Sequence, residues 1–185
     1  TGSTQWANAQ PIVQHGKVRS VALGHNGNLT NTAELRDQLL KRGVRFESTS
    51  DTEVIAALIA HDDRPLEESV LTTMKEIQGA FSAVVLSEGK LVGFRDPSGI
   101  RPLALGCLEG DWMLASENCA FDLLGAESVR ELDPGEVVVI DEEGCRTVGF
   151  ADQPNESMCI FEYIYFARPD SSLGGVELHG ARVRM

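Results

Sequence analysis

Three residues in the first third of the chain, Asn26, Gly27 and Asp51, have types that could act on an amide substrate. Amide hydrolysis passes through a tetrahedral oxyanion, which a catalyst stabilises with fixed N–H donors. The Asn26 side chain and the Gly27 backbone N–H could form such a pair, because a glycine leaves its N–H unobstructed by a Cβ. Taken alone, however, Asn-Gly is the commonest short hairpin signal, and this local sequence favours a tight turn.

Asp51 is equally ambiguous. It lies within Ser50-Asp51-Thr52-Glu53, which has the spacing of a capping box at the start of a helix. A carboxylate in the first helical turn is also stabilised by the helix dipole. The alternative is that Asp51 binds the α-ammonium group of an amino-acid substrate. Local sequence favours the cap.

A third cluster, Arg95-Asp96-Pro97-Ser98-Gly99-Ile100-Arg101-Pro102, combines two cations with residues that shape the backbone. It could form a structural corner or bind an anion, and its prolines and glycine favour the corner. The four cysteines, Cys107, Cys119, Cys145 and Cys159, contain no C-x-x-C pair. They therefore predict neither a disulfide framework nor a zinc site.

Composition limits the classes of function. The chain has 185 residues, a formal net charge of −12 and 42% hydrophobic residues, which is typical of a globular domain. Its acidity argues against a nucleic-acid partner, because nonspecific affinity for nucleic acids requires clustered cations. No apolar run approaches the roughly 20 residues that span a bilayer, and the N-terminus lacks a signal-peptide pattern. We therefore expect no membrane association and a cytoplasmic location.

Helical periodicity dominates the first half of the chain. A short apolar stretch at 18–24 predicts a buried strand, followed by a tight loop at 25–28. Asn31 is suited to cap a helix that ends at Gly43, and the capping box at Ser50 begins a second helix. Pro65 suits the first turn of a third helix, which Gly79 closes.

The period changes to strands after Ala80. Turn dipeptides separate six expected strands, at 80–87, 90–95, 103–108, 112–115, 136–140 and 145–150, with a short helix at 117–124. Helices in one block and strands in another predict an α+β domain in which antiparallel sheets are covered by helices. The polar stretch around Asp152–Asn155 predicts a domain boundary, so that residues 1–152 form one domain and 153–185 begin another.

Several motifs occur together and in order, and their series resembles the amidophosphoribosyltransferase family along essentially all 185 residues. The motifs are GHNGNLTN at 24–31, SDTE at 50–53, RDPSGIRPL at 95–103, ASENCAFD at 115–122 and CIFEYIYFARPDS at 159–171. The first two are similar to those of every class II, N-terminal-nucleophile glutamine amidotransferase. The last one distinguishes this family from the others.

The resemblance implies an N-terminal-nucleophile hydrolase domain with an αββα four-layer sandwich, here incomplete, followed by the start of a type I phosphoribosyltransferase domain. It also implies a reaction. Glutamine is hydrolysed by an N-terminal cysteine, and the ammonia displaces pyrophosphate from phosphoribosyl pyrophosphate in the presence of Mg²⁺, giving 5-phosphoribosylamine for purine synthesis. The family also implies a homotetramer. The Mg²⁺ site would lie in the part of the family's sequence that follows residue 185.

Carried over by position, Asn26 and Gly27 would form the oxyanion hole and Asp51 would bind the glutamine α-amino group. Cys159 becomes a candidate ligand of a [4Fe–4S] cluster, because cluster-holding members have a cysteine just before EYIYFARPDS. The nucleophilic cysteine, and the arginine that binds the glutamine α-carboxylate, precede residue 1 in the family.

We therefore expect this chain alone to hydrolyse nothing. The alternatives are a non-catalytic glutamine-binding domain or the amidotransferase domain of another class II enzyme.

Overall fold

The computed structural model describes residues 4–151 and 157–185 and has an α+β architecture. Its larger sheet has six antiparallel strands in the order β1-β2-β3-β4-β8-β9. These strands are β1 (Ile12–His15), β2 (Ser20–Leu29), β3 (Gly79–Ser87), β4 (Lys90–Arg95), β8 (Glu136–Asp141) and β9 (Gly144–Phe150). A 3-10 helix, Trp6–Asn8, precedes β1.

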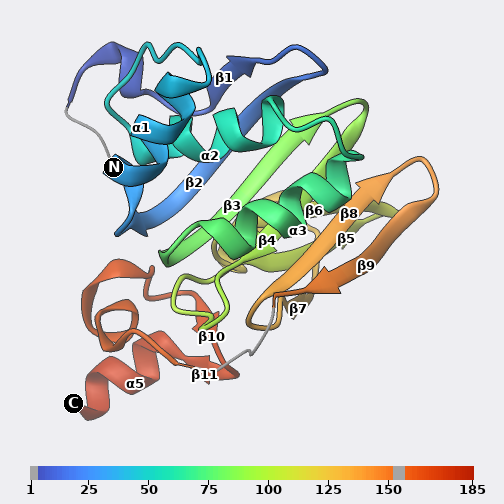
Figure 1. Cartoon of the computed structure of the whole chain (residues 1–185). Coiled ribbons are helices and arrows are strands. Elements are labelled where there is room, and N and C mark those ends of the chain that lie inside the picture. Colours follow the sequence, from blue (N-terminus) through green and yellow to red (C-terminus); the bar gives the residue numbers. More distant parts are fainter. Residues whose placement is uncertain (1–3, 152–156) are drawn as a thin grey trace.

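A second, three-stranded sheet in the order β6-β5-β7 packs behind the first one (Figure 1). Its strands are β5 (Ala104–Leu108), β6 (Asp111–Ala115) and β7 (Glu127–Glu131). The helices that cover the front of the larger sheet are α1 (Thr32–Lys41), α2 (Asp51–Ala60) and α3 (Leu66–Glu76). The short helix α4 (Cys119–Leu124) packs on the smaller sheet, because Phe121 lies against Gly106 of β5. The expected αββα layering is confirmed, with one short helix as the fourth layer.

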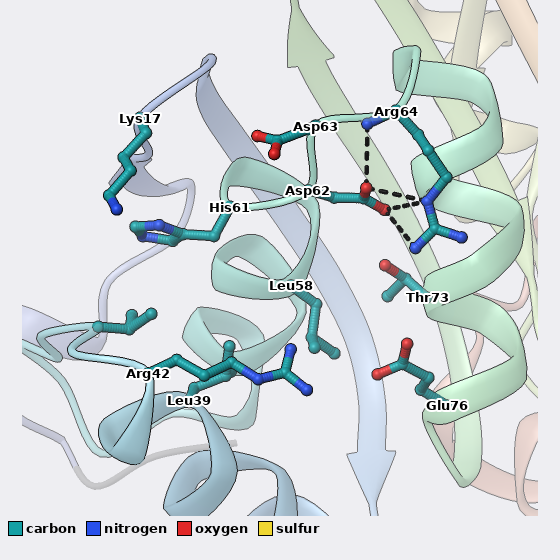
Figure 2. Close-up of a pocket in the computed structure, with 11 residues that line it drawn as sticks. Lys17, Leu39, Arg42, Leu58, His61, Asp62, Asp63, Arg64, Thr73 and Glu76 are labelled. Atoms are coloured by element: carbon teal, nitrogen blue, oxygen red, sulfur yellow. Dashed lines mark hydrogen bonds and ion pairs between the residues drawn. The ribbon is translucent and has the colours of Figure 1, made fainter.

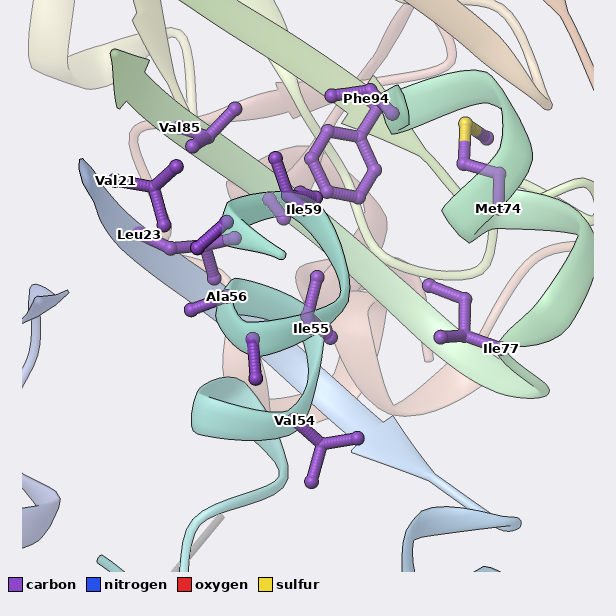
Figure 3. Packing of buried hydrophobic residues seen from close by; sticks show 14 of the residues in the cluster. Val21, Leu23, Val54, Ile55, Ala56, Ile59, Met74, Ile77, Val85 and Phe94 are labelled. Carbon is purple, nitrogen blue, oxygen red and sulfur yellow. The ribbon is translucent and has the colours of Figure 1, made fainter. Parts of the chain in front are cut away.

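Two apolar cores lie on opposite faces of the larger sheet. The helix-side core is extensive, and Figure 3 shows α2 residues such as Ile55 and Ile59 packed against Leu23 and Phe94 of the sheet. The core between the two sheets has few fully buried members: Leu103, Leu105, Leu132 and Val138. The two cores are separated because successive side chains of a strand point to opposite faces of the sheet.

Several local expectations need correction. β2 continues to Leu29, so residues 25–28 are strand and the expected tight loop is wrong. Asn31 does not cap α1 with its side chain, which instead joins Glu76 O and Gln78 N across 45 or more residues. Gly79 begins β3 rather than closing α3.

Strands β1 and β7 were not predicted. β1 has only four residues, and every residue of β7 remains at least partly exposed, so neither has a clear apolar pattern. The antiparallel pairing is confirmed, and the turns at Glu88-Gly89, Glu109-Gly110-Asp111 and Glu143-Gly144 close hairpins. The hairpin expected at Asp133-Pro134-Gly135 is wrong, because this turn joins β7 of the smaller sheet to β8 of the larger sheet.

The C-terminal segment, residues 157–185, is small and has its own core. It contains a π-helix (Glu162–Phe166), the hairpin β10 (Ser172–Leu173) with β11 (Val176–Glu177), and α5 (Leu178–Arg184). Tyr163, Ala167, Leu173 and Leu178 form the core. The predicted domain boundary around Asp152–Asn155 lies outside the described residues.

Candidate functional site

The candidate site lies along one edge of β2. β1 pairs with β2 only as far as Leu23, and no other strand of the described residues pairs with the rest of this edge. The side chain of Gln10 takes the place of a strand there: its Oε1 accepts from His25 N, and its Nε2 donates to His25 O at 2.9 Å. Four residues further on, Leu29 N donates to the carboxylate of Asp51 at 3.0 Å. Two side chains from distant parts of the sequence therefore complete this edge.

Asp51 is the first residue of α2 and is buried. Its Oδ2 accepts from Leu29, and its Oδ1 accepts from Thr52 N at 3.1 Å. Burial by itself would raise the pKa of Asp51, but hydrogen bonds that include the one from Leu29 hold this pKa below its ordinary value. Asp51 is therefore an anion at neutral pH, placed where α2 meets the open edge of β2.

The cap of α2 is only partly what the sequence predicted. Ser50 Oγ accepts from Thr52 N at 3.2 Å, which confirms Ser50 as the N-cap. Glu53 does not reach back to Ser50; its carboxylate accepts from the backbone N–H groups of Glu47 and Ser48. Capping of α2 therefore accounts for Ser50 but not for the hydrogen bond from Leu29 of β2 to Asp51.

His25 is a buried neighbour of Asp51 that sequence reasoning missed. Its Nδ1 lies 3.2 Å from Thr52 Oγ1 and 3.9 Å from Asp51 Oδ1. Burial lowers the pKa of His25 to about 4, although Asp51 opposes this shift, and the charge of Arg101 contributes to the lowering. The ring is therefore neutral at pH 7. The motif GHNGN offered the signal, but the burial became visible only in the fold.

Gly27 lies where two strands approach closely. Its φ is +137°, and a Cβ at this position would lie 2.0 Å from Ala80 O of β3. Only glycine is compatible with that contact. Asn26 lies beside it and lines a cavity of about 230 Å³ between the two sheets, together with Ala83 and Leu114.

Arg36 is a further residue that the sequence did not single out. From α1 it donates to Ser48 O at 3.0 Å and to Ser50 O at 2.9 Å, so it holds the loop that leads into Asp51. Its guanidinium also lies 4.2 Å from the Phe46 ring centroid. Both contacts are tertiary, and no residue spacing in the sequence predicts them.

The Arg95–Pro102 cluster is a structural corner, as its prolines and glycine favoured. Arg95 donates to the backbone carbonyls of Gly99, Arg101 and Leu132. Asp96 is fully buried and accepts from several backbone N–H groups of the same loop. The donors of Arg95 are therefore engaged by the corner and by Leu132, which follows β7.

A larger hollow, of about 560 Å³, lies elsewhere, on the outer side of the helices (Figure 2). Arg42 lines it just after α1, and a cation is favoured at a helix C-terminus. Arg64 forms an ion pair with Asp62 at 2.9 Å, as the dashed lines show. Among the described residues, none lines both this hollow and the cavity beside Asn26.

The part of the chain that the structure describes groups no three His, Cys, Asp or Glu residues in a way that could hold a metal ion. Cys159 is partly buried and lies just before the π-helix. Because it has a single thiol, it fits one ligand position of a cluster. Among the described residues, no helix is long and apolar enough to cross a membrane.

Comparison with known proteins identifies the family. The sequence profile of the glutamine amidotransferase domain matches residues 3–122, a range that contains Asn26, Gly27 and Asp51. This chain belongs to the glutamine amidotransferase family. The chain is 45% identical to the amidophosphoribosyltransferase of Mycobacterium leprae in an alignment of 193 positions, which covers 100% of this chain and 34% of that protein.

Two solved structures have the same fold. The glutamine phosphoribosylpyrophosphate amidotransferase of Bacillus subtilis, complexed with ADP and GMP, has a TM-score of 0.91 and 39% identity; the match covers 97% of this chain and 40% of that one. A structure described as the allosteric regulatory enzyme of purine biosynthesis has a TM-score of 0.90 and 40% identity, covering 96% and 39%. The N-terminal-nucleophile hydrolase fold and the resemblance to amidophosphoribosyltransferases are thereby confirmed. The chain spans about a third of the length of this curated relative.

Proposed function

We propose that this chain is the glutaminase portion of an amidophosphoribosyltransferase. The whole enzyme would release ammonia from glutamine and use it to convert phosphoribosyl pyrophosphate into 5-phosphoribosylamine and pyrophosphate, at the start of purine synthesis. Similarity to amidophosphoribosyltransferases along the entire chain supports this assignment.

The observation that carries the proposal is the order of groups along the open edge of β2. The N–H groups of His25 and Leu29 both point to this edge, toward Gln10 and Asp51. Because strand backbones alternate with a period of two, Gly27 N–H points the same way, between them. The candidate oxyanion donor and the candidate ammonium receptor then share one edge.

The spacing along this edge suits glutamine. Gly27 and Leu29, which holds Asp51, are two residues apart, or roughly 7 Å along an extended strand. The α-nitrogen and the amide carbon of extended glutamine are separated by four bonds, or about 5 Å. An Asp51 carboxylate that binds the ammonium group therefore leaves the amide oxygen near Gly27 N–H and Asn26, whose donors would stabilise the oxyanion.

The remaining assignments rest on the family resemblance and, for the boundary, the location and the lack of nucleic-acid partners, on the composition of the sequence. They comprise a boundary between residues 152 and 153, a nucleophilic cysteine before residue 1, Mg²⁺ bound after residue 185, a homotetramer, and a cytoplasmic location without nucleic-acid partners. Cys159 would supply one thiolate of a [4Fe–4S] cluster. No chemical step of the residues described above depends on that cluster.

The test is a pair of matched substitutions in the full-length enzyme. Asp51→Asn should raise the KM for glutamine at least tenfold, because a hydrogen bond to a charged group contributes about 1.5–3 kcal/mol. Ammonia-dependent synthesis of phosphoribosylamine should not change. Asp63→Asn, an exposed carboxylate in the outer hollow, serves as the control. An unchanged KM for glutamine in Asp51→Asn would contradict the proposed contact between Asp51 and glutamine.

A second function, non-catalytic glutamine binding, applies to the 185-residue chain alone, because its candidate donors are present while the family's nucleophile precedes residue 1. Isothermal titration with glutamine, alongside a glutaminase assay of the same sample, separates the two. Binding without ammonia release is the expected result.

A further inference from the structure

Strand β2, called here the oxyanion strand because it carries the candidate oxyanion donors Asn26 and Gly27, is connected to the C-terminal segment through a short chain of contacts. Gly27 pairs with Phe81 of β3. The backbone of Phe81 forms two bonds with Asp96: Phe81 N donates to Asp96 Oδ2 at 3.2 Å, and Asp96 N donates to Phe81 O at 2.8 Å. The fully buried Asp96 thus joins β3, opposite the candidate oxyanion donor, to the corner that follows β4.

The corner carries Arg101 toward the C-terminal segment. Arg101 N donates to Asp96 Oδ2 at 3.3 Å, and the Arg101 guanidinium lies 2.5 Å from Glu162 Oε1 in the π-helix. The same guanidinium lies 5.5 Å from the Phe166 ring centroid. Among the described residues, neither the buried Arg101 Nε nor Glu162 Oε1 has a hydrogen-bond partner, so the contact between the two side chains is an ion pair without a hydrogen bond. The corner therefore holds the backbone of Arg101, while its side chain contacts the C-terminal segment.

Two observations set this ion pair apart from an ordinary surface pair. Glu162 is 3% exposed, and its burial raises its pKa even though Arg101 opposes that shift. The charge of Arg101 also reaches the site, since it contributes to the low pKa of His25. A buried pair fixes geometry more strictly than an exposed one, because removing one partner leaves an uncompensated charge.

We propose that Arg101 is a positioning residue through which Glu162 of the C-terminal segment fixes the oxyanion strand, by way of Asp96 and Phe81. This inference rests on the proposed function and adds to it a contact that couples glutamine hydrolysis to the segment that follows the glutaminase layers. Its effect falls on the transition state, because a displaced oxyanion donor weakens binding of the developing charge more than binding of glutamine.

The experiment uses the full-length enzyme with Arg101→Met, Arg101→Lys, Glu162→Gln and the double variant Arg101→Met/Glu162→Gln. Arg146→Met is the matched control, because its ion pair with Asp141, at 2.8 Å, lies in the β8–β9 hairpin. Glutaminase kcat and KM are measured separately, together with ammonia-dependent synthesis of phosphoribosylamine.

Arg101→Met should lower glutaminase kcat about tenfold or more, below the 10²–10³ loss seen when an oxyanion donor is removed outright. We expect a KM within about twofold of the parent value, unchanged ammonia-dependent synthesis, a smaller loss in Arg101→Lys and a double variant no worse than Arg101→Met. Glu162→Gln, which nearly preserves shape, should lose kcat in the same way and provides the test if Arg101→Met fails to fold.

An unchanged kcat in Glu162→Gln overturns the proposal, as does a parallel loss of ammonia-dependent synthesis, which indicates a purely structural role. The proposed function fails differently: the parent enzyme would then release ammonia from glutamine without making phosphoribosylamine. In that case the kcat effects of Arg101 and Glu162 would still be measurable.

Discussion

The two faces of the six-stranded sheet are filled in different ways. On the helix side, residues of α1, α2 and α3 pack against alternate strand positions in one extensive core, as Figure 3 shows around Phe94. On the other side, a few buried residues from the two sheets leave a cavity of about 230 Å³ next to Asn26. Neighbouring residues of one strand, such as Gly93 and Phe94, therefore lie in different surroundings.

The difference separates stability from chemistry. A close-packed core resists changes of even one methylene, whereas a partly open layer can accommodate a ligand. We expect substitutions on the helix face to change the free energy of unfolding. Substitutions that line the cavity should mainly change catalysis. The following predictions test this division.

The largest effect is expected for Phe94→Ala. Phe94 is fully buried and contacts Phe81 edge to face, with ring centroids 6.1 Å apart. Its truncation should lower the free energy of unfolding by about 3–5 kcal/mol, because the contacts are lost and a cavity remains. Urea denaturation followed by circular dichroism measures this change. A loss below about 1 kcal/mol would contradict a tightly packed helix face.

The next largest effect, on catalysis rather than on stability, is expected for Asn26→Ala. Loss of one oxyanion donor should lower glutaminase kcat of the full-length enzyme by about 10²–10³. The free energy of unfolding should change by less than about 1 kcal/mol, since Asn26 faces the cavity. Steady-state kinetics and urea denaturation of the same variant give both numbers. A large unfolding effect with normal kcat would reverse the division between the faces.

Acid should destabilise the helix face through His25. The pKa of this histidine is lowered from 6.5 to about 4, so below pH 6.5 the unfolded chain binds a proton that the folded chain does not. His25 therefore leaves the free energy of unfolding unchanged above pH 6.5 and lowers it as the pH falls toward 4, by about 3 kcal/mol in total. Unfolding free energies measured between pH 7 and 4.5 test this slope.

His25→Gln provides the comparison for the acid prediction. It removes the titrating group, so the slope between pH 6.5 and 4 should flatten while other groups continue to titrate. An identical slope in the two proteins would exclude His25 as its source.

The smallest effect is expected for Gly93→Ala. The added Cβ would lie 2.6 Å from Leu114 Cδ1, but Leu114 also lines the cavity and its side chain can move into that space. We expect a loss of about 1 kcal/mol, at the lower end of the cost of overpacking. Thermal unfolding of Gly93→Ala beside Phe94→Ala compares neighbouring residues on the two faces. A loss equal to that of Phe94→Ala would show that the inter-sheet layer is as rigid as the core.

Sequence reasoning succeeded where the determinants are local. Turn dipeptides and helical spacing predicted α1, α2, α3 and the strands of the meander to within a few residues. It failed where the partner is distant. The Asn-Gly turn expected at 26–27 is a strand, because β3 pairs with it from more than 50 residues away. β7 lacks an apolar pattern and was missed.

The candidate site followed the same division. The motif series named Asn26, Gly27 and Asp51 as one group, but not the reason that they belong together. Gln10 and Arg36 support this site through tertiary contacts alone, and no pattern pointed to them.

By itself, the sequence determined the family, the α+β class and the residue types available for amide chemistry, because periodicity, turn residues and motif order are local properties. Only the tertiary structure decided that Asp51 completes the edge of β2, that Gly27 lies against β3, and that Arg101 reaches Glu162. These contacts join residues far apart in the chain. Their free energy depends on burial and distance, which exist only once the layers have packed.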